Sequence, residues 1–178
     1  MANSSFAVHH SSPSGLLIRR ATGRDAERIV AILRKISSER VHSAIDEPWS
    51  VDEERSYLES LSPREAVHVA VAENGQVIGF QTLDRWSPTL NSMAHVAQLG
   101  TFLLPEWRGR GVGTALYKTA LAFARASDYS KIVIQVRASN QSAQAFYERL
   151  GFRPCGRLKQ QVRIDGQEDD EILMEFFL

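Results

Sequence analysis

The sequence of 178 residues contains a single cysteine, Cys155, so it cannot form an intrachain disulfide. Paired cysteines are typical of oxidising compartments, so we expect a cytoplasmic protein in which Cys155 has a structural role. No apolar run approaches the roughly 18 residues of a membrane span. The serine-rich residues 1–15 lack the continuous apolar segment of a secretion signal. We expect residues 1–15 to be a disordered tail and residues 16–178 to form one domain.

An excess of charge of one sign is also absent. Lys and Arg total 21, and Asp and Glu total 21. This balance gives no electrostatic reason to expect a nucleic-acid or membrane partner, and we predict neither. The five histidines show no metal-binding spacing, so we predict no metal site. With 43% hydrophobic and 24% charged residues, the composition is typical of a globular domain.

Local patterns predict the first elements of this domain. Residues 16–20 have the pattern of a short strand. Capping boxes and apolar spacing then predict one helix from Thr22 through Ile36 and another from Val51 to about Leu61. The polar residues 41–49 between them either cover a substrate or simply connect the helices.

The order of the remaining elements indicates the fold class. Asn74-Gly75 favours a tight hairpin turn, so we expect an antiparallel pair of strands around it. The further elements, in chain order, are strands over residues 66–73, 76–83 and 95–104, a helix to about 126, a strand over 131–137, a helix over 142–150, and strands over 153–164 and 171–178. This order predicts an α/β (α+β) fold, a mixed central sheet of about six to seven strands with helices on both faces.

A glycine-rich turn follows the predicted strand at residues 95–104. Residues 108–113 read Arg-Gly-Arg-Gly-Val-Gly and lead into an amphipathic helix. Glycines let the backbone approach a ligand closely, and a helix N-terminus offers unpaired N–H groups and the positive end of the helix dipole. The turn is therefore either an anion site, which a pyrophosphate would fit, or a plain connector with surface arginines. A P-loop would need a lysine after the glycines, and a dinucleotide fingerprint would need a glycine at Thr114 or Leu116.

A second segment of interest spans residues 137–152. Asn140 is placed to cap the helix that follows it, and Gly151 is placed to end that helix. On the residues alone, Asn140 is a cap and Tyr147 is a core aromatic residue with a bonded hydroxyl.

Together the two segments resemble a known family. Residues 108–113 match the (Gln/Arg)-x-x-Gly-x-(Gly/Ala) signature of the GNAT acetyltransferases, and residues 137–152 resemble the second conserved block of that family. The order and spacing of the two motifs are similar to those of a GNAT domain covering residues 16–178. The resemblance implies an enzyme that transfers an acetyl group from acetyl-CoA to a primary amine. The amine would be a small molecule, an amino acid or a protein N-terminus, attacking directly within a ternary complex.

The resemblance also implies roles for individual residues. Thr101, Phe102 and Leu103 match the strand positions that pair with the pantetheine arm, with a backbone N–H near the thioester oxygen. Asn140 is expected to bond the pantetheine arm or a nearby backbone group, and Tyr147 to protonate the departing thiolate. The pyrophosphate of coenzyme A is expected at Arg108, Gly109, Arg110, Gly111, Val112, Gly113 and Thr114.

The general base is not identified by the resemblance. Relatives often carry glutamate where Gln98 and Gln135 stand, and neither amide can take a proton. Alternatively, the acceptor arrives neutral, as an α-amino group with a pKa near 8 partly does, which would favour an α-amine over a lysine side chain. Candidates for a base, acting directly or through water, are His42, Asp46, Glu47, Asp84 and His95.

The missing carboxylates leave a second interpretation open, a catalytically weak acetyl-CoA-binding sensor or interaction module. The acidic residues Asp169, Asp170 and Glu171 either attract a cationic acceptor or form a solvated turn. A homodimer is the default expectation for an assembly of a soluble protein.

Overall fold

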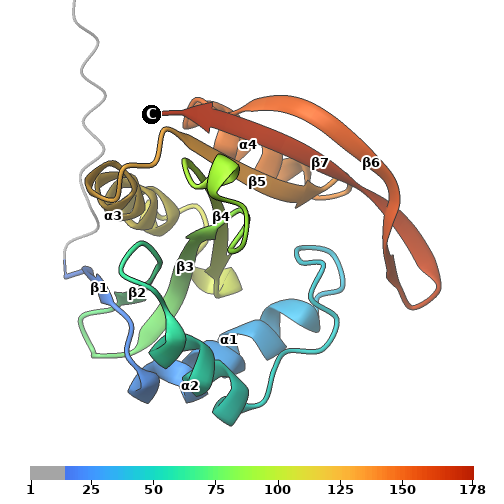
Figure 1. The fold of residues 1–178 in the computed structure, drawn as a ribbon. Coiled ribbons are helices and arrows are strands. Elements are labelled where there is room, and N and C mark those ends of the chain that lie inside the picture. The colour runs from blue at the N-terminus through green and yellow to red at the C-terminus, as the bar shows by residue number, and fades with distance from the viewer. Residues whose placement is uncertain (1–14) are drawn as a thin grey trace, which may run out of the picture.

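Seven strands form one open mixed sheet in the computed structural model, which describes residues 15–178 (Figure 1). The strand order is β1-β2-β3-β4-β5-β7-β6. Every neighbouring pair is antiparallel except β4 and β5, which are parallel. The predicted mixed sheet of six to seven strands is confirmed. The tail expected at residues 1–15 falls almost entirely outside the described residues.

The elements begin and end close to where the sequence patterns place them. The strands are β1 Leu17–Arg20, β2 Ala66–Val71, β3 Val77–Arg85, β4 Val96–Leu103, β5 Lys131–Arg137, β6 Arg153–Ile164 and β7 Gln167–Phe177. The α-helices of the described chain are α1 Ala26–Ser37, α2 Val51–Ser60, α3 Val112–Ala126 and α4 Gln141–Arg149. None of the helices within residues 15–178 has the length and hydrophobicity that a membrane span requires.

Helices α1 and α2 cover one face of the sheet at β2 and β3. Ile29, Leu33 and Ile36 recur at helical spacing along α1 and are buried. They pack in one cluster with Val67 and Val69 of β2. The period of 3.6 residues in the helix and of two in the strand brings these side chains to one interface.

Helices α3 and α4 lie on the opposite face. Leu116 of α3 packs with Ile78 of β3, and both side chains are fully buried. Tyr147 of α4 belongs to a neighbouring cluster with Ile134 of β5 and Met174 of β7. The helices therefore cover both faces, as predicted.

The long β6–β7 hairpin extends beyond the rest of the sheet and curls towards the loop that follows α1 (Figure 1). Its turn lies at Asp165 and Gly166, which both have positive φ angles, 51° and 75°. Asp169, Asp170 and Glu171 lie within β7, so the interpretation of these residues as a solvated turn was wrong. Cys155 lies exposed on β6, outside the core clusters of the described residues, and its Sγ donates to the Leu173 carbonyl at 3.5 Å.

Helix α3 positions the glycine-rich turn, because the turn leads directly into it. We predict that Leu116→Ala lowers the free energy of unfolding by about 2–5 kcal/mol, since truncating a buried leucine loses apolar contacts and leaves a cavity. Chemical denaturation with a matched Lys118→Ala variant, at an exposed position of the same helix, measures this. A loss for Leu116→Ala no greater than for Lys118→Ala would contradict the packing described.

Candidate active site

The parallel pair β4 and β5 separates soon after it begins. Among the described residues, the pairing runs only from Val96–Lys131 to Gln98–Val133, although both strands continue. β3 stays paired with β4 as far as Leu103, and β7 stays paired with β5. The sheet therefore opens between β4 and β5 beyond Gln98.

The opening leaves backbone groups of β4 unpaired. Leu104 donates its N–H to the Ile78 carbonyl and Trp86 donates to the Val96 carbonyl, so the even-numbered residues of β4 carry the bonds to β3. Thr101 and Leu103 consequently direct their backbone groups to the free edge, whereas those of Phe102 face β3. Phe102 instead stacks its ring on Phe80, with 4.8 Å between ring centroids. Of the three predicted pantetheine residues, Thr101 thus has both backbone groups free for a ligand and Leu103 has its N–H, because the Leu103 carbonyl accepts from Arg108 Nε.

The glycine-rich turn connects this free edge to α3. Gly109 and Gly111 have φ angles of 70° and 81°, in the left-handed region that favours glycine. Gly113 meets α4 closely, because a Cβ there would lie 3.1 Å from the Phe146 ring. Ala115 donates to the Gly111 carbonyl, which leaves the preceding N–H groups, those of residues 112–114, without a partner in the helix. These groups and the dipole of a 15-residue helix suit an anion.

The two arginines of the turn are placed differently from each other. Arg108 donates two hydrogen bonds to the Glu39 carboxylate, at 3.0 and 2.6 Å, and one from Nε to the Leu103 carbonyl. The Arg108 guanidinium holds the pKa of Glu39 below its usual value. Arg110 lies over the Trp107 ring, 5.5 Å from its centroid. Arg108 therefore fastens the turn to the end of α1, and Arg110 is the arginine of the turn whose charge has no carboxylate partner among the described residues.

Tyr147 reaches β4 from α4. Its hydroxyl donates to Thr101 Oγ1 at 2.9 Å, and the fully buried Gln81 donates from Nε2 to the same oxygen at 2.6 Å. Burial raises the pKa of Tyr147 to about 12, which keeps the phenol protonated at neutral pH. The structure thus brings two residues predicted from different segments of the chain, Tyr147 and Thr101, into direct contact.

Asn140 caps α4 and also fixes a distant loop. Its Oδ1 accepts from the Ala143 N–H at 3.1 Å, and its Nδ2 donates to the His42 carbonyl at 3.3 Å. Nearby, the buried Arg137 donates to the Arg40 carbonyl at 2.6 Å and to Asp169 at 2.9 Å. The polar loop after α1 is therefore clamped to the ends of β5 and β7.

A hydrogen-bonded chain crosses the sheet on the face that carries α1 and α2. Gln98 of β4 donates from Nε2 to Gln135 Oε1 at 2.9 Å, and Gln135 donates from Nε2 to Glu171 Oε2 at 3.2 Å. Burial, and to a smaller extent the charge of Asp169, raises the pKa of Glu171, which is 8% exposed. Gln98 and Gln135 are thus hydrogen-bonded to each other, and the buried Glu171 carboxylate ends the chain of hydrogen bonds.

Two more carboxylates lie on the other side of Gln98. Asp84 of β3 is the direct cross-strand partner of Gln98 and accepts a hydrogen bond from the Tyr57 hydroxyl at 2.5 Å. Glu54 of α2 is 4% exposed, and among the described residues its carboxylate has no hydrogen bond or ion pair. Burial, with a contribution from the charge of Asp84, raises the pKa of Glu54 to about 7. Burial also raises the pKa of Asp84.

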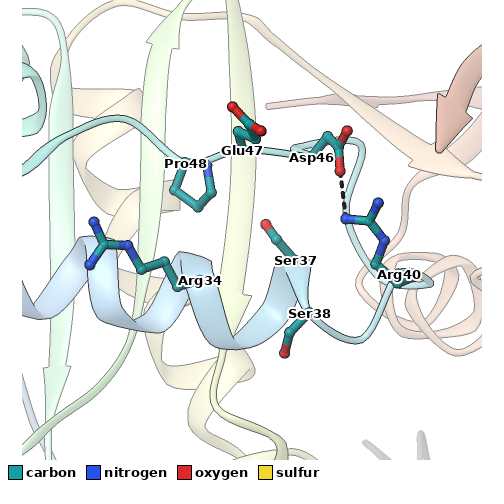
Figure 2. Close-up of a pocket in the computed structure, with 7 residues that line it drawn as sticks. All are labelled: Arg34, Ser37, Ser38, Arg40, Asp46, Glu47 and Pro48. Atoms are coloured by element: carbon teal, nitrogen blue, oxygen red, sulfur yellow. Dashed lines mark hydrogen bonds and ion pairs between the residues drawn. The ribbon is translucent and has the colours of Figure 1, made fainter. Parts of the chain in front are cut away.

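The other predicted base candidates are placed less favourably. Asp46 pairs with Arg40, and His42 lies 4.0 Å from Glu39. Glu47 lines a surface hollow of about 410 Å³ between α1 and the loop (Figure 2). The hollow is lined by Arg34, Ser37, Ser38, Arg40, Asp46, Glu47 and Pro48.

Sequence reasoning missed Glu54 and named Glu171 only as part of the acidic run of residues 169–171, although each left a signal. Glu54 occupies the first position of the stripe Glu54, Tyr57, Leu58 and Leu61, where helical spacing calls for an apolar residue. Glu171 lies two residues before Leu173, on the same face of a strand. A charged residue at a position that packs inward is the pattern that marks both.

Comparison with known proteins identifies the family of the chain. The acetyltransferase (GNAT) family profile matches residues 27–152. The peptidyl-lysine N-acetyltransferase YjaB of Escherichia coli is 31% identical over 140 residues, 79% of this chain and 84% of that protein. The N-alpha-acetyltransferase RimI of Mycobacterium tuberculosis is 26% identical over 123 residues, 69% of this chain and 73% of that protein.

Solved structures share the fold. The ribosomal-protein-alanine N-acetyltransferase of Brucella melitensis superimposes with a TM-score of 0.84 at 26% identity, covering 91% of this chain and 99% of that one. A phosphinothricin acetyltransferase of Sinorhizobium meliloti, solved in complex with acetyl-CoA, gives 0.85 at 23% identity and covers 92% and 89%. The family profile spans most of the chain, and solved acetyltransferases share its fold. The chain therefore belongs to the GNAT family of acetyltransferases.

Proposed function

We propose that this protein transfers an acetyl group from acetyl-CoA to a primary amine by direct attack within a ternary complex. The observation that carries the proposal is the free edge of β4, which leads into the glycine-rich turn and has the Tyr147 hydroxyl bonded to it at Thr101. An extended donor, a pyrophosphate site and an acid for the leaving group are thereby aligned along one strand.

The donor would lie in the opening between β4 and β5. Backbone groups of Thr101 and Leu103 would bond the pantetheine amides as a neighbouring strand does. The pyrophosphate would lie at the turn, against the N–H groups at the start of α3 and near Arg110. Asn140 and Arg108 would support the site indirectly, because Asn140 holds the loop after α1 and Arg108 holds the turn against α1.

Tyr147 would protonate the thiolate as the thioester breaks. A phenol with a pKa raised to about 12 is protonated at neutral pH and so keeps its proton for the leaving group. Thr101 Oγ1 would hold the hydroxyl in place until the donor binds, since it accepts from both Tyr147 and Gln81. In the reaction, the amine nitrogen forms a bond to the acetyl carbon, the C–S bond breaks, and Tyr147 gives its proton to sulfur.

Glu54, assisted by Asp84, would accept the proton that the amine loses. A base is most effective when its pKa lies near the working pH, and the pKa of Glu54 is about 7. Asp84 lies beside Gln98 at the point where the sheet opens. The preference for an α-amine followed from the lack of a base, so these carboxylates remove its premise. The α-amine and lysine acceptors named for the relatives are both candidates for this chain.

Thiol release from acetyl-CoA across a panel of α-amines, lysine ε-amines and small amines tests the proposal. We predict that Tyr147→Phe lowers kcat by at least about tenfold with the best acceptor, because a general acid contributes about that much or more. The Kd for acetyl-CoA, measured by calorimetry, should change little.

Tyr117→Phe is the matched control, since Tyr117 is also buried and no hydrogen bond partner of its hydroxyl is present among the described residues. Binding of acetyl-CoA without turnover of any amine would support a sensor or interaction module instead. Absence of acetyl-CoA binding would refute the proposal.

A separate prediction concerns Glu54, whose pKa is raised from 4.5 to about 7. The folded protein holds this proton more tightly than the unfolded chain, so the free energy of unfolding falls as the pH rises between these values. We predict that Glu54→Gln stabilises the protein at pH 8 by about 1–3 kcal/mol, has little effect at pH 4, and lowers kcat/KM at least about tenfold.

Thermal denaturation and acetyl transfer at the two pH values measure these effects. Glu59→Gln, at an exposed position of the same helix, should change neither quantity. If Glu54→Gln kept full activity at pH 8, another group would have to accept the proton.

A further inference from the structure

The chain of Gln98, Gln135 and Glu171 has a fixed direction. An ionised carboxylate can only accept hydrogen bonds, so Glu171 requires Gln135 to turn its NH₂ group towards β7. The Gln135 carbonyl oxygen must then face β4, where it accepts from the Gln98 NH₂ group. The carbonyl oxygen of Gln98 then points away from Gln135. It has no hydrogen bond partner among the described residues.

The free oxygen lies at a defined place in the sheet. Gln98 is the last residue of β4 that pairs with β5, so its side chain lies where the opening begins. Asp84 is beside it on β3, and the row continues through Gln135 of β5 to Glu171 of β7. An acceptor oxygen in this row, with a carboxylate on each side, suits a group that carries N–H donors and positive charge.

We propose that Glu171 is a positioning residue that fixes the direction of the glutamine chain, so that Gln98 Oε1 accepts a hydrogen bond from the amine that is to be acetylated. This inference rests on the proposed acetyl transfer and assigns the amine's contact within it. Gln98 does not take the proton. It orients the nitrogen while another group accepts the proton, and so the glutamines serve the reaction without being a base.

Burying a carboxylate is energetically unfavourable, and a purely structural contact at this position would not require one. The Glu171 residue is only 8% exposed, and burial raises the pKa of its carboxyl group. Its hydrogen bond from Gln135 holds the carboxylate in place. A leucine or a second glutamine would fill the position, but neither would dictate which way the amides of Gln135 and Gln98 point.

Kinetics with the best amine acceptor test the inference. We expect Glu171→Gln to raise KM for the amine about five- to tenfold, the loss of roughly one well-oriented hydrogen bond. The Kd for acetyl-CoA should stay within about twofold, since the donor would bind along β4 and the glycine-rich turn and Glu171 lies on β7. Glu175→Gln, four residues along the same face of β7 and paired with Lys131, is the control and should leave KM unchanged.

A double-mutant cycle separates positioning from a structural role. Gln98→Leu removes the accepting oxygen, so we expect Glu171→Gln to add no further loss in that background. Independent, additive losses would overturn the inference, because Glu171 would then act by another route. A KM change for Glu175→Gln as large as that for Glu171→Gln would overturn it as well.

A readout without turnover distinguishes this inference from the proposed function. In the CoA-bound protein, ethylamine should shift the side-chain NH₂ signals of Gln98 and Gln135 in ¹⁵N-correlated NMR spectra, and the shift should be lost in Glu171→Gln. If acetyl transfer fails but this shift is seen, the proposed reaction is wrong and the amine contact stands. If transfer is observed and ethylamine moves neither signal, the reaction stands and the contact is wrong.

Discussion

The short parallel join between β4 and β5 is the constraint on which the rest of the structure depends. Three residue pairs hold the two strands together, and beyond Gln98 each strand follows its antiparallel partner, β3 or β7. Antiparallel partners are held along most of their length, so the join is the place where the sheet opens. The opening leaves an unpaired strand edge in the middle of the sheet. A ligand with peptide-like amides can form hydrogen bonds to this edge as a neighbouring strand would.

The helices give this opening two chemically different faces. On the side of α3 and α4, the edge is lined by Thr101 and the phenol of Tyr147, which suits departure of a thiol. On the side of α1 and α2, the same level of the sheet carries Asp84, Gln98 and Glu171. Alternation of side chains along the strands separates the two faces, so donor and acceptor chemistry can meet at one gap without sharing residues.

Several polar residues connect the site to parts of the chain that would otherwise be loose. Arg137 and Asn140 bond the backbone of the loop after α1, and Arg40 pairs with Asp165 at the tip of the β6–β7 hairpin. Arg137 is 9% exposed, and a buried guanidinium is stable only when its donors are satisfied. The carbonyls of Arg40 and Ser43 accept these hydrogen bonds, so the loop after α1 is held at the end of β5.

The sequence by itself determined the elements, the mixed sheet and the glycine-rich turn. Helical and strand periodicity, capping boxes and turn residues act over a few neighbouring positions, so they can be read without knowing the fold. The resemblance to the GNAT family likewise singled out Tyr147 in the second motif and Thr101 in the strand before the turn, and the structure places the two in contact. Only the tertiary structure decided that Arg108 binds Glu39 and that Asn140 holds the His42 carbonyl.

The row of acidic and amide side chains was likewise decided by the tertiary structure. Glu54 meets Asp84 across 30 residues of chain, and Gln135 meets Glu171 across 36. Such pairs depend on strand order and on register, and shifting a strand by one residue would turn each side chain to the other face. Local patterns carry no information about register between distant segments. The sequence therefore determined what kind of protein this is, while packing decided which carboxylates gather where the sheet opens.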